Sequence, residues 1–241
     1  MSPYRRIPVL VYHKIAEPSD YDVNPNTCVT HANFESQMKL MAGLGYLTTD
    51  PAEYLKARLG LPARLPAKPF LITFDDAFES VLTRALPVLK KHGFSAALFM
   101  VSSGFGRSAF WDGEVANSPN CLLKPDQLKE LRDEGWMIGS HGISHRNYKD
   151  LDAPALEVEA ARSKAELERT LGSEVSWFAY PYGDYTPAAK SALAGAGYKI
   201  GFATEKGDGD IFAVPRRVIS GKSGLLNFSL RLWQAGNRST R

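Results

Sequence analysis

FLITFDD, residues 70–76, is a continuous apolar run that ends in two adjacent aspartates. Several other short runs in the chain are built in the same way, namely VLVYH (9–13), AALFMV (96–101), MIGSH (137–141), WFAYPY (177–182) and IGFAT (200–204). Several of them are nearly continuous rather than alternating in polarity, which is typical of strands that are covered on both faces. The runs therefore predict a largely parallel sheet.

Segments with helical start and stop residues lie between these runs. Pro125 begins one that ends at Gly135, and Pro154 begins a longer one that ends at Gly172. Alternation of strands and helices predicts parallel βαβ units. Because six or seven units follow one another without a linker or a break in composition, we expect an α/β barrel of about seven parallel strands in a single domain.

Composition and charge exclude several classes of protein. The chain has 241 residues and is 44% hydrophobic, which is enough for one large core. Lys and Arg exceed Asp and Glu by 29 to 26, and no basic stripe with interleaved aromatic residues is present, so we expect no nucleic-acid partner. No protein partner is indicated, and Cys28 and Cys121 are expected to stay unbridged thiols.

The beginning of the chain shows neither a transmembrane segment nor a signal peptide. The apolar run at residues 7–12 is too short to span a bilayer, and no small-residue cleavage site follows it. We therefore expect a cytoplasmic protein, although a secreted protein whose leader has been removed would look the same.

Ionisable residues gather where the expected strands end. Asp75 and Asp76 follow one strand, His141 ends another with His145 four residues later, and His13 ends the first. Working residues of parallel α/β folds lie at the carboxyl ends of strands. Adjacent buried carboxylates are costly unless a cation neutralises them, and two imidazoles with one carboxylate are a ligand set of zinc hydrolases. The sequence therefore predicts a metal site.

Two other interpretations of these residues stay open. The aspartates could cap the following helix while the histidines are ordinary surface groups. Alternatively, two histidines and one carboxylate are also the ligands of non-haem iron oxygenases. The joint placement at strand ends argues against the first interpretation, and the second adjacent aspartate suits water activation for hydrolysis better than oxygen chemistry.

The motifs ITFDD, SHGISH and FAYPYG, in this order after VLVYHKI, resemble those of the polysaccharide deacetylases of the NodB-homology type, carbohydrate esterase family 4. The resemblance covers about residues 7–220. It implies a distorted (β/α) barrel and hydrolysis of N-acetyl groups on amino-sugar oligo- or polysaccharides. It also implies one divalent metal ion, Zn²⁺ before Co²⁺, Ni²⁺ or Mn²⁺. We thus expect one NodB-like domain over residues 1–241, with a core at about 7–220 and a C-terminal tail at about 235–241.

The resemblance also assigns roles to individual residues. Asp75 would be the general base, and Asp76 would bind the metal ion together with His141 and His145. The cation would acidify a water molecule and polarise the substrate carbonyl while Asp75 takes a proton.

Four further residues are expected to contact the substrate, namely Trp111, Tyr180, Pro181 and Tyr182. The backbone N–H of Tyr182, which follows Pro181 in the PYG motif, would stabilise the oxyanion. Trp111 and Tyr180 are candidates for stacking on sugar rings, although aromatic residues are often simply packed in the core.

The chain departs from the family pattern in three places. Gly142 stands where a serine or threonine commonly follows the first metal histidine. No arginine precedes the Pro-Tyr motif, and the segment VPRRVIS offers Arg216, or less favourably Arg217, to orient the base. No histidine follows His145, so the usual late general acid is missing.

The missing acid leaves alternatives open for the residue and for the function. His13 is the remaining imidazole candidate for protonating the leaving amine, and Asp112 or Glu114 on the long loop at 102–124 could serve instead. A catalytically impaired carbohydrate-binding relative is one alternative function, and an O-acetyl esterase acting on a glycan is another.

Overall fold

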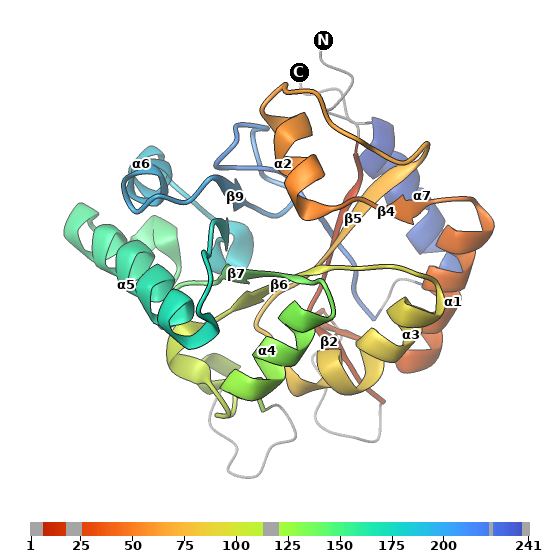
Figure 1. Ribbon diagram of the computed structural model, residues 1–241, viewed down its shortest axis with the longest axis horizontal. Coiled ribbons are helices and arrows are strands. Elements are labelled where there is room, and N and C mark those ends of the chain that lie inside the picture. Colours follow the sequence, from red (N-terminus) through yellow and green to blue (C-terminus); the bar gives the residue numbers. More distant parts are fainter. Residues whose placement is uncertain (1–6, 18–25, 113–120, 222–223, 238–241) are drawn as a thin grey trace.

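The structure is a computed structural model that describes residues 7–17, 26–112, 121–221 and 224–237. Parallel strands form a curved central sheet, and helices surround it (Figure 1). The order of the strands is β10–β1–β5–β6–β7–β8–β9, and β4 pairs with the beginning of β5. The bounds are β1 Val9–Tyr12, β4 Leu47–Thr48, β5 Pro69–Phe74, β6 Ala97–Met100, β7 Met137–Ser140, β8 Trp177–Ala179, β9 Ile200–Phe202 and β10 Arg217–Val218.

These strands confirm the predicted α/β fold with seven parallel strands curled into a distorted barrel. The barrel is distorted because β9 and β10 at the two edges do not form a regular ladder with each other. A single parallel bridge joins Phe202 to Val214, just before β10 begins. Arg216 therefore lies in the segment that spans the gap between the two edges.

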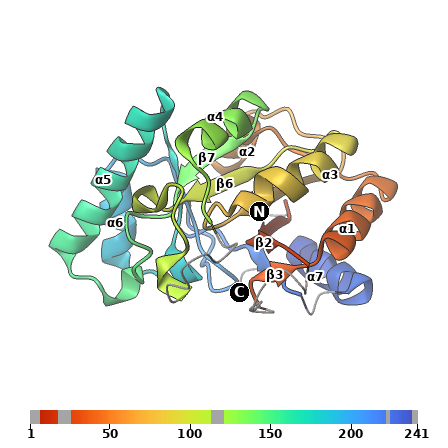
Figure 2. The same cartoon turned by 90° about the horizontal axis from the view of Figure 1, so that it is seen from below.

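Helices cover the outside of the sheet, with α5 and α6 on one side and α1 and α7 on the opposite side (Figures 1 and 2). Side chains of Thr30, Asp50, Asp152 and Thr186 cap four of them by accepting a backbone N–H of the first turn. The bounds are α1 His31–Gly43, α2 Pro51–Arg58, α3 Leu86–Lys91, α4 Pro125–Asp133, α5 Ala153–Leu171, α6 Pro187–Gly195 and α7 Leu225–Asn237.

Successive residues of each strand pack into two different apolar clusters. Val9, Leu71 and Phe99 belong to an inner cluster inside the barrel, which Tyr54 of α2 joins. Their neighbours along the strands belong to a larger cluster under the surrounding helices. Because both faces are buried, the strands read as continuous apolar runs.

Some elements differ in extent from the expected ones. The run at 177–182 forms a strand only as far as Ala179, and Pro181–Gly183 is a 3-10 turn, because proline lacks the N–H that a ladder needs. The expected loop at 102–124 contains 3-10 turns at Ser102–Gly104 and Phe110–Asp112. Two short strands, β2 Lys14–Ile15 and β3 Cys28–Val29, pair outside the barrel.

Three further expectations concern the ends of the chain and its cysteines. Helix α7 continues to Asn237, so the first residues of the expected tail are helical, and 238–241 lie outside the described residues. Among the described helices, none is long and apolar enough to cross a membrane. Cys28 and Cys121 are both thiols rather than halves of a disulfide.

Candidate active site

The two adjacent aspartates leave the end of β5 in different directions. Asp75 continues the ladder, because its N–H donates to Tyr12 O at 3.0 Å, and it lies on the same side of β5 as Thr73 and Leu71. Asp76 and Ala77 have positive φ angles of 70° and 63°, in the left-handed region that non-glycine residues rarely adopt. This turn places Asp75 inside the barrel and aims Asp76 toward the loop after β7.

Arg216 holds the Asp75 carboxylate in a two-pronged ion pair. Its Nη1 donates to Asp75 Oδ1 at 2.6 Å, and its Nη2 donates to Oδ2 at 2.7 Å. The guanidinium also donates to Thr73 Oγ1 and to Ala203 O, and it lies 5.4 Å from the ring centre of Phe99. Both charged groups are buried, so the carboxylate is fixed in orientation.

The neighbouring basic residue is placed elsewhere. Arg217 pairs with Glu205 at 2.8 Å and does not reach the aspartates. Of the two arginines that the sequence offered, the structure brings Arg216 to the site.

The environment of Asp75 keeps it ionised. Burial by itself raises the pKa of Asp75, but the Arg216 guanidinium opposes this effect, with help from nearby His141 and His13. The net result is a pKa below the ordinary value of 3.8. At neutral pH Asp75 is therefore a carboxylate that can accept a proton.

Asp76, His141 and His145 converge on one point. Asp76 Oδ1 lies 3.2 Å from His145 Nε2 and 3.5 Å from His141 Nε2. One potential ligand atom from each of the three residues lies within 4.8 Å of the other two, and all three side chains are buried. Four-coordinate donors about 2.1 Å from a zinc ion lie about 3.4 Å from one another, so these separations fit one shared cation.

The protonation of His141 strengthens the fit to a metal. His141 Nδ1 lies 2.7 Å from Ala179 O, and a carbonyl oxygen only accepts, so Nδ1 carries the proton and Nε2 presents a lone pair. Burial lowers the pKa of His141 to about 4, so the ring is neutral at pH 7. Asp76 Oδ1 has no hydrogen-bond partner in the described part of the chain. A lone pair and a carboxylate oxygen that face each other in the interior would be stabilised by a cation between them.

Two aromatic rings enclose His145. Trp111 stacks on the imidazole with ring centres 4.2 Å apart and an interplanar angle of 17°. Tyr182 meets the ring edge-on at 4.7 Å, and its side chain is 55% exposed. The sequence placed Trp111 and Tyr182 among the substrate-contacting candidates, and the structure brings both to the edge of the metal-ligand cluster.

A pocket of about 510 Å³ opens beside these residues. His145 and Tyr182 line one side of it, and Arg146, Asn147 and Asp150 supply polar groups. An aromatic ring with polar groups around it is a surface suited to a sugar ring.

Of the remaining candidate site residues, some lie at the site and one does not. His13 follows β1 directly, beside Asp75 in the sheet, and its imidazole contributes to lowering the pKa of both aspartates. Pro181 is buried in the turn below Tyr182. Tyr180 has no exposed surface and packs against Tyr148, so its expected stacking on a sugar ring is not possible in this structure.

The alternative acids are outside what the structure describes. Glu114 lies in the range 113–120, which is outside the described residues, and the same holds for the side chain of Asp112.

Some features of the site carry no signal in the sequence. Asp76, Ala77, His145 and Tyr182 all have positive φ although none is a glycine. Strained backbone of this kind gathers at functional sites. The contribution of Thr73, which accepts from Arg216, could have been found only from its place two residues before Asp75 in the strand.

Comparison with known proteins agrees with this geometry. The family profile for polysaccharide deacetylase matches residues 63–201. A Bacillus subtilis protein named as a polysaccharide deacetylase, YxkH, is 30% identical over 224 residues, which is 91% of this chain and 74% of the relative. The poly-beta-1,6-N-acetyl-D-glucosamine N-deacetylase of Staphylococcus aureus is 25% identical over 210 residues, covering 81% of this chain and 69% of that protein.

A solved structure agrees as well. The Streptococcus pyogenes deacetylase PplD in complex with acetate superposes with a TM-score of 0.78 at 26% identity, covering 94% of this chain and 97% of that one. The similarity therefore extends over nearly the whole of both chains.

Proposed function

This chain belongs to the polysaccharide deacetylase family, and from this premise we propose that it is a metal-dependent hydrolase that removes N-acetyl groups from amino-sugar-containing oligo- or polysaccharides. The observation that carries the proposal is the ionised Asp75, locked by Arg216, directly beside the cluster of Asp76, His141 and His145. A curated relative that acts on an N-acetylglucosamine polymer supports the class of substrate.

Asp76, His141 and His145 would hold one divalent ion, with Zn²⁺ favoured by the two imidazoles and one carboxylate over Co²⁺, Ni²⁺ or Mn²⁺. When bound, this ion lowers the pKa of a water molecule and polarises the carbonyl of the acetamido group. Trp111 shields the outer face of the His145 ring and so keeps that ligand in place.

Asp75 is the proposed general base. Arg216 fixes the carboxylate plane, and each oxygen keeps a lone pair free to accept a proton from the attacking water. The same ion pair neutralises the charge of Asp75 and fixes its orientation, which disfavours a turn of the carboxylate toward the metal as a further ligand.

His13 is the proposed general acid that protonates the leaving amine. It lies next to Asp75 across β1 and β5, and its buried Nδ1 has no hydrogen-bond partner among the described residues. The backbone N–H of Tyr182 is proposed to stabilise the oxyanion, while its exposed ring and the adjoining pocket receive a sugar.

Two other functions are less well supported. A binding protein that has lost catalysis would have no need to keep the base both buried and ionised. An O-acetyl esterase would use the same residues, because the same attack by water cleaves esters and amides, so the choice between them rests on the test below.

The test is release of acetate from N-acetylglucosamine oligomers by protein that has been stripped of metal and then reloaded with Zn²⁺, Co²⁺ or nothing. The proposal predicts release that depends on the metal and is abolished in Asp75→Asn, with an O-acetylated glycan as the parallel substrate. Acetate from the ester alone would replace the proposal by the esterase function. Absence of release from both substrates by the metal-loaded protein would contradict it.

A further inference from the structure

The loop from His141 to His145, called here the histidine loop, carries two of the three proposed metal ligands. Its backbone enters the left-handed region twice, at Gly142 with φ of 80°, which suits a glycine, and at His145 with φ of 55°, which is rare for a residue with a side chain. Conformations of this kind persist only where the surroundings determine them. The groups that hold the histidine loop therefore determine where its two imidazoles lie.

One side of the loop is tied to the end of β6. Ser102 N donates to Gly142 O at 3.0 Å, and Ser103 donates to Ile143 O through its N–H at 3.1 Å and its hydroxyl at 2.6 Å. These bonds satisfy carbonyl groups and leave the N–H groups of the loop to find acceptors elsewhere.

Glu159 on α5 supplies these acceptors. Its Oε2 accepts from Ile143 N at 2.7 Å and from Ser144 N at 3.4 Å, and its Oε1 accepts from the Ser144 hydroxyl. Glu159 is 6% exposed, so the bonds are made in the interior, where hydrogen bonds to a charged group are strong.

Gly142 explains why a carboxylate can come so close. A Cβ at this position would lie 3.2 Å from Glu159 Oε2 and 3.3 Å from Tyr148 Oη, tighter than most side-chain contacts. The family's common serine or threonine after the first metal histidine would therefore crowd Glu159 here. Gly142 leaves room for the Glu159 carboxylate, and this carboxylate, which comes from α5, holds the histidine loop.

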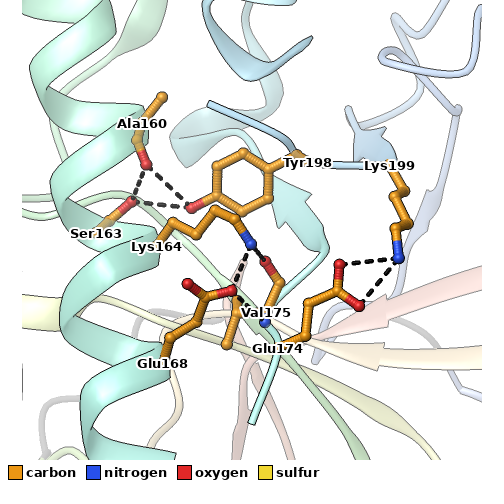
Figure 3. A network of polar contacts seen from close by, with 8 residues as sticks. All are labelled: Ala160, Ser163, Lys164, Glu168, Glu174, Val175, Tyr198 and Lys199. Carbon is orange, nitrogen blue, oxygen red and sulfur yellow. Dashed lines mark hydrogen bonds and ion pairs between the residues drawn. The ribbon is translucent and has the colours of Figure 1, made fainter. Parts of the chain in front are cut away.

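A chain of two hydrogen bonds through Ser140 links α5 to the beginning of the loop. Gly142 N donates to Ser140 Oγ at 3.2 Å, and Ser140 donates to Ser163 Oγ at 2.9 Å. Ser163 lies one turn after Glu159 and is linked further to Tyr198 (Figure 3). The same face of α5 is therefore bonded directly to Ile143 and Ser144 and is linked to Gly142 through Ser140.

We propose that Glu159 is a positioning residue for the metal site, which sets the separation and direction of His141 and His145 through the backbone of the histidine loop. This inference rests on the proposed function, because it requires that the two histidines bind a metal. Replacing a residue that holds a metal ligand in place typically weakens the affinity for the metal by about 10–100-fold.

The test measures the dissociation constant for Zn²⁺ by competition with a chelator, in the full chain. Glu159→Gln is expected to weaken Zn²⁺ binding by about 10–100-fold, because the amide keeps only one of the two acceptor oxygens and loses the charge that strengthens the bonds to the loop. The Co²⁺-loaded variant is expected to show an altered visible absorption spectrum, which reports the geometry of the ligands and not the stability of the fold.

The matched control is Glu168→Gln on the same helix. Glu168 Oε1 also accepts a backbone N–H, from Val175 at 3.0 Å, and it pairs with Lys164 away from the metal ligands (Figure 3). This variant is expected to keep the Zn²⁺ affinity and the Co²⁺ spectrum of the wild type, even if its melting temperature falls.

If Glu159→Gln does not fold, Ser144→Ala is the deciding variant. It removes only the hydroxyl donor to Glu159 and is expected to weaken Zn²⁺ binding about threefold to tenfold. Wild-type affinity and spectrum in a folded Glu159→Gln, or in Ser144→Ala when that variant decides, would overturn the inference while leaving the proposed function intact. A wild-type protein that binds no divalent ion would instead overturn the proposed function, and the inference with it.

Discussion

Replacing Arg216 by methionine gives a quantitative test of the ion pair that holds the proposed base. Methionine keeps much of the apolar volume beside Phe99 but removes both charge-assisted hydrogen bonds to Asp75. The Asp75 side chain is 5% exposed, so its carboxylate would be left as an uncompensated charge in the interior. Breaking a buried pair in this way costs about 3–5 kcal/mol of unfolding free energy.

A double-mutant cycle separates the ion pair from ordinary loss of packing. Asp75→Asn leaves the guanidinium without its carboxylate and is expected to be destabilising as well. Because both penalties come from one pair, the double variant should be more stable than the sum of the single effects predicts, by at least about 2 kcal/mol.

The assay is urea unfolding at pH 7 followed by circular dichroism, with a chelator present so that a change in metal binding does not contribute. Single effects that add to within about 0.5 kcal/mol would refute the reasoning, because they would show that the two residues do not stabilise each other.

Three further predictions concern the surroundings of the site. Two lysines and Asn147 hold the pKa of Asp184 at about 2, below the ordinary 3.8, so its stabilisation is present above pH 4 and is lost as the pH falls toward 2. Because those lysines are exposed, Asp184→Asn should cost only about 1 kcal/mol at pH 7 and a small fraction of that at pH 2, measured by urea unfolding at both pH values. Gly183→Ala should cost about 2–3 kcal/mol, since φ is 71° and the new Cβ would lie 2.3 Å from Thr204 Cγ2. Gly172→Ala, with φ of 69° and open space, should cost about 1 kcal/mol, and equal losses would contradict the steric argument. Tyr182→Gly should raise KM about threefold to tenfold in steady-state acetate release, without lowering the melting temperature, because it removes an exposed ring but relieves a φ of 61°. An unchanged KM would argue against sugar contact by Tyr182.

The barrel and the convergence of the ligands could be predicted from the sequence for a simple physical reason. Parallel strands must be buried on both faces, so each one appears as an apolar run, and the residue after each run lies at the same end of the sheet. His141 directly follows its strand, Asp76 and His145 lie two and five residues after theirs, and all three converge in the structure.

Burial on both faces also explains what the sequence could not show. Within WFAYPY no alternation marks which residues face inward, and Tyr180 packs in the outer cluster beneath the helices rather than at the site. The left-handed conformations at Asp76 and His145 are imposed by tertiary contacts, without the glycine that would have signalled them.

The pairing of Asp75 with Arg216 could be predicted only in part. The basic dipeptide was visible in the sequence, but the choice between Arg216 and Arg217 depends on how the chain spans the gap between β9 and β10. Contacts between residues so far apart in the sequence are set by the curvature of the whole barrel, which no local pattern encodes.

The most direct test of the metal site is an anomalous difference map from crystals grown with Zn²⁺, recorded at the zinc absorption edge. One peak within about 2.0–2.2 Å of Asp76 Oδ1, His141 Nε2 and His145 Nε2 is predicted, with Asp75 bonded to Arg216 and not to the metal. A map with no peak at these three atoms, or with the zinc bound to Asp75, would contradict the account.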